Sequence, residues 1–355
     1  MTVATRKMPI TKGERALSYR APRTLEIAKY EPSEPGSREV QVEVAFNGIC
    51  GTDLHIFHGA MDARVKPPSV IGHEMSGVVA AIGAGVEDIT VGERVTVMPL
   101  DWCDSCPACV AGHTHICHNL KFLGIDTPGA MQTRWNVPRR AVLSLPVGLS
   151  LKEAALTEPT AVAVHDVRRA QLREGDRALV VGGGPIGLLI AAVARSFGAD
   201  VVVMEPNTQR RALAESLNFT SLNPADTGAE QMISDWTGGA GVTVAFEVSG
   251  VAEGVESAIQ ALATRGRLVI VAIHTQPPPV NLRHVFWREL TLLGARVYER
   301  RDFDEAMRLL EMGQIPTQTL ITDVVPLAEA ARAFEALERG EAMKILVDCA
   351  SGESL

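Results

Sequence analysis

The stretch ALVVGGGPIGLLIAAVARSF, residues 178–197, decides the fold of the central part of this chain. It opens with a short apolar run, passes through a cluster of glycines and continues into an apolar segment of helical length. A buried strand that turns through glycines into a helix is the first part of a nucleotide-binding βαβ unit. The segment therefore predicts a parallel sheet that binds a dinucleotide.

The glycines of this stretch fit the fingerprint G-x-G-x-x-G. Gly182 allows the tight turn, Gly184 lets the backbone approach a pyrophosphate, and Gly187 permits close packing of the helix on the strand. The N–H groups at the start of the helix are free to bind phosphate. Glu205 ends the next apolar run, where it can accept the ribose hydroxyls of NAD and repel the 2′-phosphate of NADP. We expect NAD in preference to NADP, although two arginines follow closely; a glycine turn with a solvated glutamate is the alternative.

Around this stretch the chain divides into two parts. Up to about residue 156 it is β-rich, because residues 39–46 (EVQVEVAF) alternate polar and apolar side chains as a half-buried strand does. From about residue 177 strands alternate with helices, which indicates a doubly wound parallel sheet. The fold class is therefore α/β, with barrel-like antiparallel structure beside the parallel sheet. Strands are expected at 39–46, 76–82, 94–98, 178–181, 201–204, 242–246, 268–271, 291–297 and 344–347, helices at 186–197, 208–217 and 251–262, a connection at 166–172 and a helical tail from 302.

Four of the six cysteines form a compact cluster with the spacing C-x2-C-x2-C-x7-C. They are Cys103, Cys106, Cys109 and Cys117. Four thiolates this close can surround one ion tetrahedrally, and Zn²⁺ prefers such sulfur ligands in structural sites. Disulfides are the alternative, but residues 1–20 contain no apolar signal core. The segment is rich in turn-forming residues, so we expect the metal to hold it folded.

The composition narrows the classes of function. At 355 residues the chain is long enough for two domains, and 46% hydrophobic with 21% charged residues is ordinary for a globular protein. A formal net charge of −8 argues against nucleic acid and anionic membranes as partners. No apolar run reaches the roughly 18 residues of a membrane span. We expect a cytoplasmic protein.

Two further segments carry side chains that can bind metal: GICGTDLH at 48–55 and GHE at 72–74. The candidates are Cys50, His73 and Glu74, together with Glu158 in the tripeptide TEP. A mixed sulfur, nitrogen and oxygen site with an open position is the catalytic type of zinc site. Taken singly, the cysteine and histidine could be structural core residues and Glu158 an ordinary surface residue.

Together these motifs resemble those of the zinc-dependent medium-chain alcohol dehydrogenases. The matching pieces, in family order, are residues 48–55, 72–74, 103–117, 157–159 and 182–187. The resemblance covers essentially the whole chain and is strongest to the branch that acts on polyols, 2,3-butanediol and threonine. It implies a GroES-like β-rich catalytic domain at 1–160 and 298–355, with a metal lobe at 101–118, and a Rossmann domain at 161–297.

The resemblance also assigns roles to single residues. Cys50 and His73 would hold a catalytic zinc, Glu74 or Glu158 would complete its coordination, and Asp53 would orient His73. Thr52 would accept the alcohol proton and pass it towards the ribose of the cofactor and His55. Two zinc ions per chain are implied, one catalytic and one structural. The positions implied to contact NAD are Gly182, Gly184, Pro185, Ile186, Gly187, Glu205, Arg210, Val271, Ala272, Ile273, Ala295, Arg296 and Val297.

The expected reaction is hydride transfer between NAD and a secondary alcohol or ketone. Ile56 and Val297 stand where sorbitol-type enzymes usually carry an aromatic residue and an arginine, so a small vicinal diol such as 2,3-butanediol is favoured. L-Threonine and sugar alcohols are the alternatives. A non-catalytic NAD-binding or zinc-free relative would lack both metal sets, which this chain keeps. The family also implies a homodimer or homotetramer.

Overall fold

The computed structural model describes residues 13–350 and contains two compact units. The first comprises Met1–Glu158 with Leu320–Leu355, and the second comprises Pro159–Thr319. The sequence-based division placed residues 298–319 in the first domain, whereas here they belong to the second. Asp302 in α10 (Arg300–Glu311) accepts hydrogen bonds from His165 Nδ1 at 2.8 Å and Arg168 Nη1 at 3.2 Å, which ties α10 to α4 (Thr157–Arg169). The expectation that residues 1–20 carry no apolar signal core concerns mostly residues 1–12, which lie outside the described residues.

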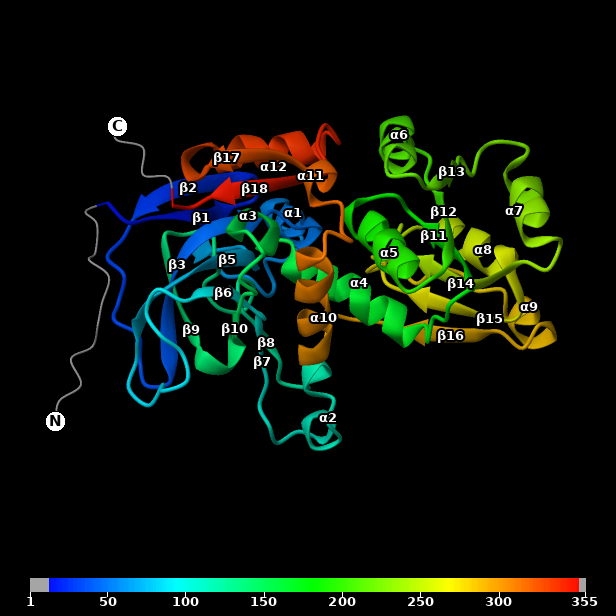
Figure 1. The fold of residues 1–355 in the computed structure, drawn as a ribbon. Helices are drawn as coiled ribbons and strands as arrows, with labels where there is room; N and C mark the ends of the chain where they lie inside the picture. Colours follow the sequence, from blue (N-terminus) through cyan, green and yellow to red (C-terminus); the bar gives the residue numbers. More distant parts are fainter. Residues whose placement is uncertain (1–12, 351–355) are drawn as a thin grey trace. The chain divides into compact units, whose positions relative to one another are not determined.

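The first unit is built around a sheet in the order β10-β6-β5-β3-β18-β17, with β9 also pairing with β3. The central strand β3 (Glu39–Gly48) buries Val40, Val42 and Val44 completely. Figure 1 shows β18, from the red end of the chain, beside the blue N-terminal strands, and it pairs antiparallel with β3. The other strands of this sheet are β5 (Glu74–Ile82), β6 (Arg94–Val97), β9 (Arg134–Pro138), β10 (Val142–Ser144), β17 (Ile321–Pro326) and β18 (Lys344–Asp348).

Shorter elements complete this unit. Two small sheets have the orders β2-β1-β4 and β7-β8. Their strands are β1 (Arg15–Ala21), β2 (Thr24–Lys29), β4 (Ser69–Val70), β7 (Leu100–Asp101) and β8 (Lys121–Phe122). The helices are α1 (Gly51–Phe57), α2 (Pro107–Val110), η1 (Thr114–Ile116), η2 (Arg139–Ala141), α3 (Leu151–Ala154), η3 (Leu327–Glu329) and α12 (Ala330–Glu338). The short helix α11 (Thr317–Leu320) falls at the point in the chain where the second unit ends and the first resumes.

The second unit is a six-stranded parallel sheet in the order β13-β12-β11-β14-β15-β16. This is the doubly wound order in which ligands bind beyond the carboxyl ends of the strands. Its core includes Leu179, Val202, Ala245 and Leu268, all buried. The strands are β11 (Arg177–Val181), β12 (Asp200–Met204), β13 (Thr220–Leu222), β14 (Val242–Glu247), β15 (Leu262–Ile270) and β16 (Thr291–Gly294), and the remaining helices are α5 (Pro185–Ser196), α6 (Thr208–Ser216), α7 (Ala229–Thr237), α8 (Ala252–Ala261) and α9 (Leu282–Trp287).

The expected α/β fold class is confirmed, although several expected elements differ; the strand expected at 291–297, for example, ends at Gly294. The segment 166–172, expected as a connection, is helical up to Arg169 as the end of α4. The tail from residue 302 is not helical throughout, because β17 lies between α10 and α12 and pairs in parallel with β18. Nowhere between residues 13 and 350 is a helix both long and apolar enough to cross a bilayer.

Candidate functional site

Helix α1 begins at the expected metal-binding cysteine. Cys50 is its N-cap, and its Sγ accepts a hydrogen bond from Thr52 N at 3.5 Å. In return the side chain of Asp53 accepts from Cys50 N at 2.9 Å, which completes a capping box and fixes the start of the helix. Thr52 and His55 lie one turn apart, three residues from each other, and so share a face of α1. The N-terminal part of α1 and its cap therefore place four of the residues with predicted roles.

The other two metal-ligand candidates lie where β5 begins. His73 precedes the strand and Glu74 is its first residue, paired with Gly48 of β3. A Cβ at Gly48 would lie 2.2 Å from Glu74 Oε2, so only glycine leaves room for this carboxylate. One donor atom from each of Cys50, His73 and Glu74 lies within 4.8 Å of the others. The structure thus brings together residues from the end of one strand and the start of its neighbour.

A buried lysine that the sequence reasoning did not single out is bound to Glu74. Lys344 Nζ, at the start of β18, donates to Glu74 Oε1 at 2.8 Å and Oε2 at 2.7 Å, and to Ile49 O at 3.0 Å. Burial opposes the charged ammonium, but the negative charges of Glu74, Cys50 and Glu158 outweigh burial and raise the pKa of Lys344 above its usual value. Both oxygens of Glu74 are therefore engaged by a cation that the protein itself supplies. Glu74, and not Glu158, belongs to the group of side chains whose donor atoms lie within 4.8 Å of one another, but both of its oxygens are already hydrogen-bonded to Lys344.

Glu158 is 5% exposed, so the surface interpretation of this residue is wrong. Its charge acts on His73: burial lowers the pKa of this imidazole, but Asp53, Cys50 and Glu158 together raise it well above its ordinary value. Asp53 Oδ1 lies 3.7 Å from His73 Nδ1, which is an ion-pair distance. Nε2 is then the ring nitrogen that can bind a metal ion. Four potential anions, Cys50, Asp53, Glu74 and Glu158, against Lys344 and the His73 imidazole leave an excess of negative charge here, which a divalent cation would balance.

The cysteine cluster has the dimensions of a tetrahedral sulfur site. Cys117 Sγ lies 3.4 Å from Cys103 Sγ and 3.7 Å from Cys106 Sγ, and all four sulfurs, that of Cys109 included, lie within 4.8 Å of one another. A Zn–S bond of about 2.3 Å in a tetrahedron separates the sulfurs by roughly 3.8 Å. A disulfide would require about 2.05 Å, and the cysteines are free. The residues present therefore fit a zinc ion.

The electrostatics of this cluster also indicate a cation. Hydrogen bonds, the largest from Asn119, lower the pKa of Cys103 to about 5. Burial and hydrogen bonds with the neighbouring sulfurs raise the pKa of Cys109 to about 12. Four thiolates cannot all be charged side by side without a positive ion, because the like charges repel one another. The local buried cluster consists of three cysteines with partly buried side chains around them, so little apolar core would hold this segment without metal.

The glycine-rich turn has the geometry that the fingerprint predicts. Helix α5 starts directly after Gly184, which is its N-cap. A Cβ at Gly187 would lie 1.9 Å from Gly182 O, so the close approach of α5 to the turn requires glycine. Glu205, which follows β12, is buried; its Oε2 accepts from Gly183 N at 2.7 Å and its Oε1 from Asn207 N at 2.8 Å. The carboxylate thus lies against the turn that would bind the dinucleotide.

Six of the remaining predicted cofactor residues follow the ends of neighbouring parallel strands, whereas Arg210 lies in α6. Residues 271–273 follow β15 and residues 295–297 follow β16, at the carboxyl edge of the sheet where ligands bind. Arg210 Nη1 lies 3.9 Å from Glu205 Oε2. Besides Lys344, the sequence reasoning missed Glu247 and His274 at this edge. A carboxylate directly after the buried run VTVAF is a signal that could have indicated Glu247.

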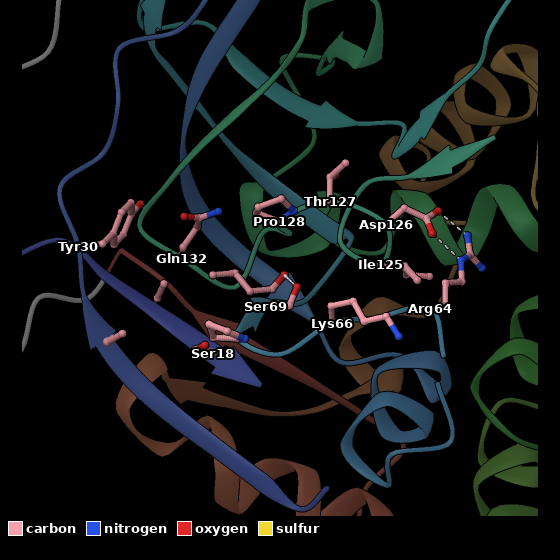
Figure 2. Close-up of a pocket in the computed structure, with 14 residues that line it drawn as sticks. Ser18, Tyr30, Arg64, Lys66, Ser69, Ile125, Asp126, Thr127, Pro128 and Gln132 are labelled. Atoms are coloured by element: carbon pink, nitrogen blue, oxygen red, sulfur yellow. Dashed lines mark hydrogen bonds and ion pairs between the residues drawn. The ribbon is translucent and has the colours of Figure 1, made fainter. Parts of the chain in front are cut away.

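A hollow of about 570 Å³, lined by both apolar and polar side chains, lies elsewhere on the first unit, and Figure 2 shows its lining. Arg64 pairs with Asp126 through two contacts of 2.6 Å, and Lys66 Nζ donates to Asp62 O at 2.9 Å. The charged groups of the lining are thus bound to the protein itself. None of the metal-ligand candidates lines this hollow.

Two family models match the chain. Residues 36–147 match the alcohol dehydrogenase GroES-like domain, and residues 185–312 match the zinc-binding dehydrogenase domain. A 2-dehydro-3-deoxy-L-galactonate 5-dehydrogenase of Pseudoalteromonas atlantica is 52% identical over 335 residues, which is 94% of this chain and 98% of the relative.

Solved structures of dehydrogenases are also similar to this chain over most of its length. The 2R,3R-butanediol dehydrogenase of Bacillus subtilis superposes with a TM-score of 0.89 at 30% identity, covering 94% of this chain and 99% of the other. A zinc-binding dehydrogenase of Sinorhizobium meliloti, solved with bound NADP, has a TM-score of 0.88 at 29% identity and covers 95% of this chain and 100% of its own.

Proposed function

The chain belongs to the zinc-dependent medium-chain alcohol dehydrogenases, and from that premise we propose that it oxidises a secondary hydroxyl of a six-carbon sugar acid with NAD. The observation that carries this proposal is the 52% identity, over nearly the whole of both chains, to the 2-dehydro-3-deoxy-L-galactonate 5-dehydrogenase. In such a substrate the C5 hydroxyl lies between hydroxyls on C4 and C6. The C5 hydroxyl is therefore part of a vicinal diol, which is the chemical group that the sequence motifs favour in a substrate.

A small vicinal diol such as 2,3-butanediol is the second candidate. It is supported by the likeness to the butanediol dehydrogenase structure, at 30% identity. The sugar acid is preferred because one fold hosts many substrates, so a shared fold says little about specificity. The relative at 52% identity is therefore a better guide to the substrate of this chain than the structure at 30% identity.

Within the first unit we assign Cys50, His73 and Glu158 to the catalytic zinc. A zinc ion bound there would supply a Lewis acid that makes an alcohol easier to deprotonate. Asp53 would orient the His73 ring, and Lys344 would keep Glu74 neutralised. Thr52 can accept the proton of the alcohol and pass it to His55, which is exposed on the same face of α1. The four cysteines at 103–117 would hold the second zinc.

A substrate panel tests the proposed function. We expect NAD reduction, followed by absorbance, with kcat/KM for 2-dehydro-3-deoxy-L-galactonate at least ten-fold above that for 2,3-butanediol, sorbitol or L-threonine. The extra hydroxyl and carboxylate contacts of a matched substrate are worth at least about 1.4 kcal/mol in the transition state. A higher kcat/KM for butanediol or threonine than for the sugar acid would contradict the proposal.

The preference for NAD should depend on Glu205. Replacing Glu205 with serine is expected to raise kcat/KM for NADP relative to NAD by about ten-fold, because the like charge is lost while Arg210 and Arg211 stay nearby. The substitution should also lower the stability of the protein, because Gly183 N and Asn207 N lose the carboxylate that accepts their hydrogen bonds. A melting temperature measured beside the kinetics separates that cost from the change in preference. An unmodified protein that already favours NADP would refute the assignment.

We propose self-association through the edge strand β16, which ends the order of the parallel sheet. Beside it, Leu282, Phe286 and Trp287 are at least 70% exposed, and Leu292 on the strand itself is 38% exposed. Large apolar side chains gathered at an unpaired sheet edge are typical of an interface. Light scattering on the purified protein should give a mass of two or four chains.

A further inference from the structure

A buried carboxylate lies at the centre of the carboxyl edge of the parallel sheet. Glu247 is the last residue of β14, the strand between β11 and β15, and it is fully buried. Its Oε1 accepts from Ser249 N and Gly250 N, both at 2.9 Å, and from Ser249 Oγ at 2.5 Å. Its side chain therefore fixes the loop that follows β14.

The backbone around Glu247 joins the loops of both neighbouring strands. Val248 N donates to Val181 O at 2.9 Å, directly before the glycine-rich turn. On the other side, Val271 N and Ala272 N both donate to Glu247 O, at 3.0 and 3.1 Å. Glu247 thus lies between the turn expected to bind the pyrophosphate and the segment 271–273 expected to contact the nicotinamide. A dinucleotide stretched along this edge must pass it.

The second oxygen of Glu247 binds a histidine. His274 Nε2 lies 2.9 Å from Glu247 Oε2, and the imidazole is 11% exposed. A carboxylate can only accept, so Nε2 carries the proton, and Nδ1 of the neutral ring keeps a free lone pair. None of the described residues is hydrogen-bonded to Nδ1. An oriented acceptor is therefore available at the edge of the sheet where the cofactor binds.

We propose that His274, held by Glu247, is a cofactor-binding residue whose Nδ1 accepts a hydrogen bond from the nicotinamide-nucleoside half of the dinucleotide. This inference rests on the proposed use of NAD and adds a side-chain contact to the backbone contacts expected from residues 271–273. The donor on the ligand is either a ribose hydroxyl or the carboxamide N–H₂ group, which offer the same chemistry. The adenosine half lies towards Glu205 and should not depend on His274.

The test compares the binding of three ligands to the purified zinc-loaded protein by calorimetry, without turnover. The ligands are NADH, ADP-ribose, which lacks the nicotinamide, and ADP, which lacks the second ribose as well. His274→Ala should weaken NADH at least ten-fold and leave ADP unchanged. A loss for NADH alone would assign the contact to the carboxamide, and a parallel loss for ADP-ribose would assign it to the ribose; both support the proposal.

Equal losses for all three ligands, or no loss for any, would overturn the proposal, because the histidine would then only support the loop or do nothing. Thr275→Ala, at the exposed neighbouring position, is the matched control and should leave all three affinities unchanged. If His274→Ala does not fold, Glu247→Gln should weaken the three ligands in the same order. The glutamine amide would donate to Nε2, so the ring proton would move to Nδ1, which could then no longer accept a hydrogen bond. Failure of the unmodified protein to bind NADH would instead refute the proposed function.

Discussion

Replacing Cys50 with serine is expected to lower kcat/KM by at least about 1,000-fold, roughly 4 kcal/mol of transition-state stabilisation. Cys50 has two roles in the structure, as a metal-ligand candidate beside His73 and as the N-cap of α1. Serine is a good N-cap, so the helix and its capping box should survive. Its hydroxyl is not a thiolate and binds zinc far more weakly. The substitution therefore separates the metal role from the structural role.

Zinc analysis, a melting temperature and a control variant should accompany the kinetics of Cys50→Ser. Zinc analysis is expected to fall from two ions per chain to one, while the melting temperature changes by only a few degrees. Cys349→Ser provides the control, because Cys349 is a buried cysteine that lies outside both groups of metal-ligand candidates. It should keep both zinc ions and its activity. Cys50→Ser protein as active as the parent would show that Cys50 is not part of the catalytic site.

Replacing Cys106 with serine should cause the largest loss of stability. Structural zinc contributes about 10 to 16 kcal/mol of apparent binding free energy in small zinc domains, and much of that is folding free energy. Because the buried cluster around residues 102–120 consists largely of the cysteines themselves, little else would hold it. We expect the loss of one zinc ion and a fall in melting temperature of at least about 10 °C, since 1 kcal/mol shifts a protein of this size by about 2 °C.

The control for this variant lies in the same segment. Ser105→Ala removes only a hydroxyl that reaches Cys103 Sγ at 3.7 Å, so both zinc ions and the melting temperature should be nearly unchanged. Hydrogen exchange should show faster exchange at residues 101–118 in Cys106→Ser and not in Ser105→Ala. Retention of two zinc ions by Cys106→Ser would contradict the structural assignment of the four cysteines.

The parts of the fold that short-range sequence patterns encode were predictable. The glycine fingerprint sits between a strand and a helix, as β11 and α5 show, and the cysteine spacing predicts one compact cluster. These signals are local, because all the residues involved lie within about 20 positions of one another. Strand β17 was missed because its six residues lie between two helices, in a tail whose overall pattern is helical.

The contacts that sequence did not reveal join distant positions. Lys344 meets Glu74 across 270 positions, and only the pairing of β18 with β3 brings them together. Glu158 could not be told from a surface residue by its neighbours in sequence, and only the structure shows that it is buried. His274 likewise acquires its partner Glu247 only when β14 and β15 lie side by side.

If the proposed function is right, the group around Cys50 and His73 is a zinc site on which sugar-acid oxidation depends. The most direct test is to remove the metal from the purified protein with a chelator and then restore it stepwise, while measuring zinc content and NAD reduction with 2-dehydro-3-deoxy-L-galactonate. We predict that activity disappears as the zinc content falls from two ions per chain to one, and returns in proportion when zinc is added back. Full activity on the sugar acid in protein free of zinc would contradict the account.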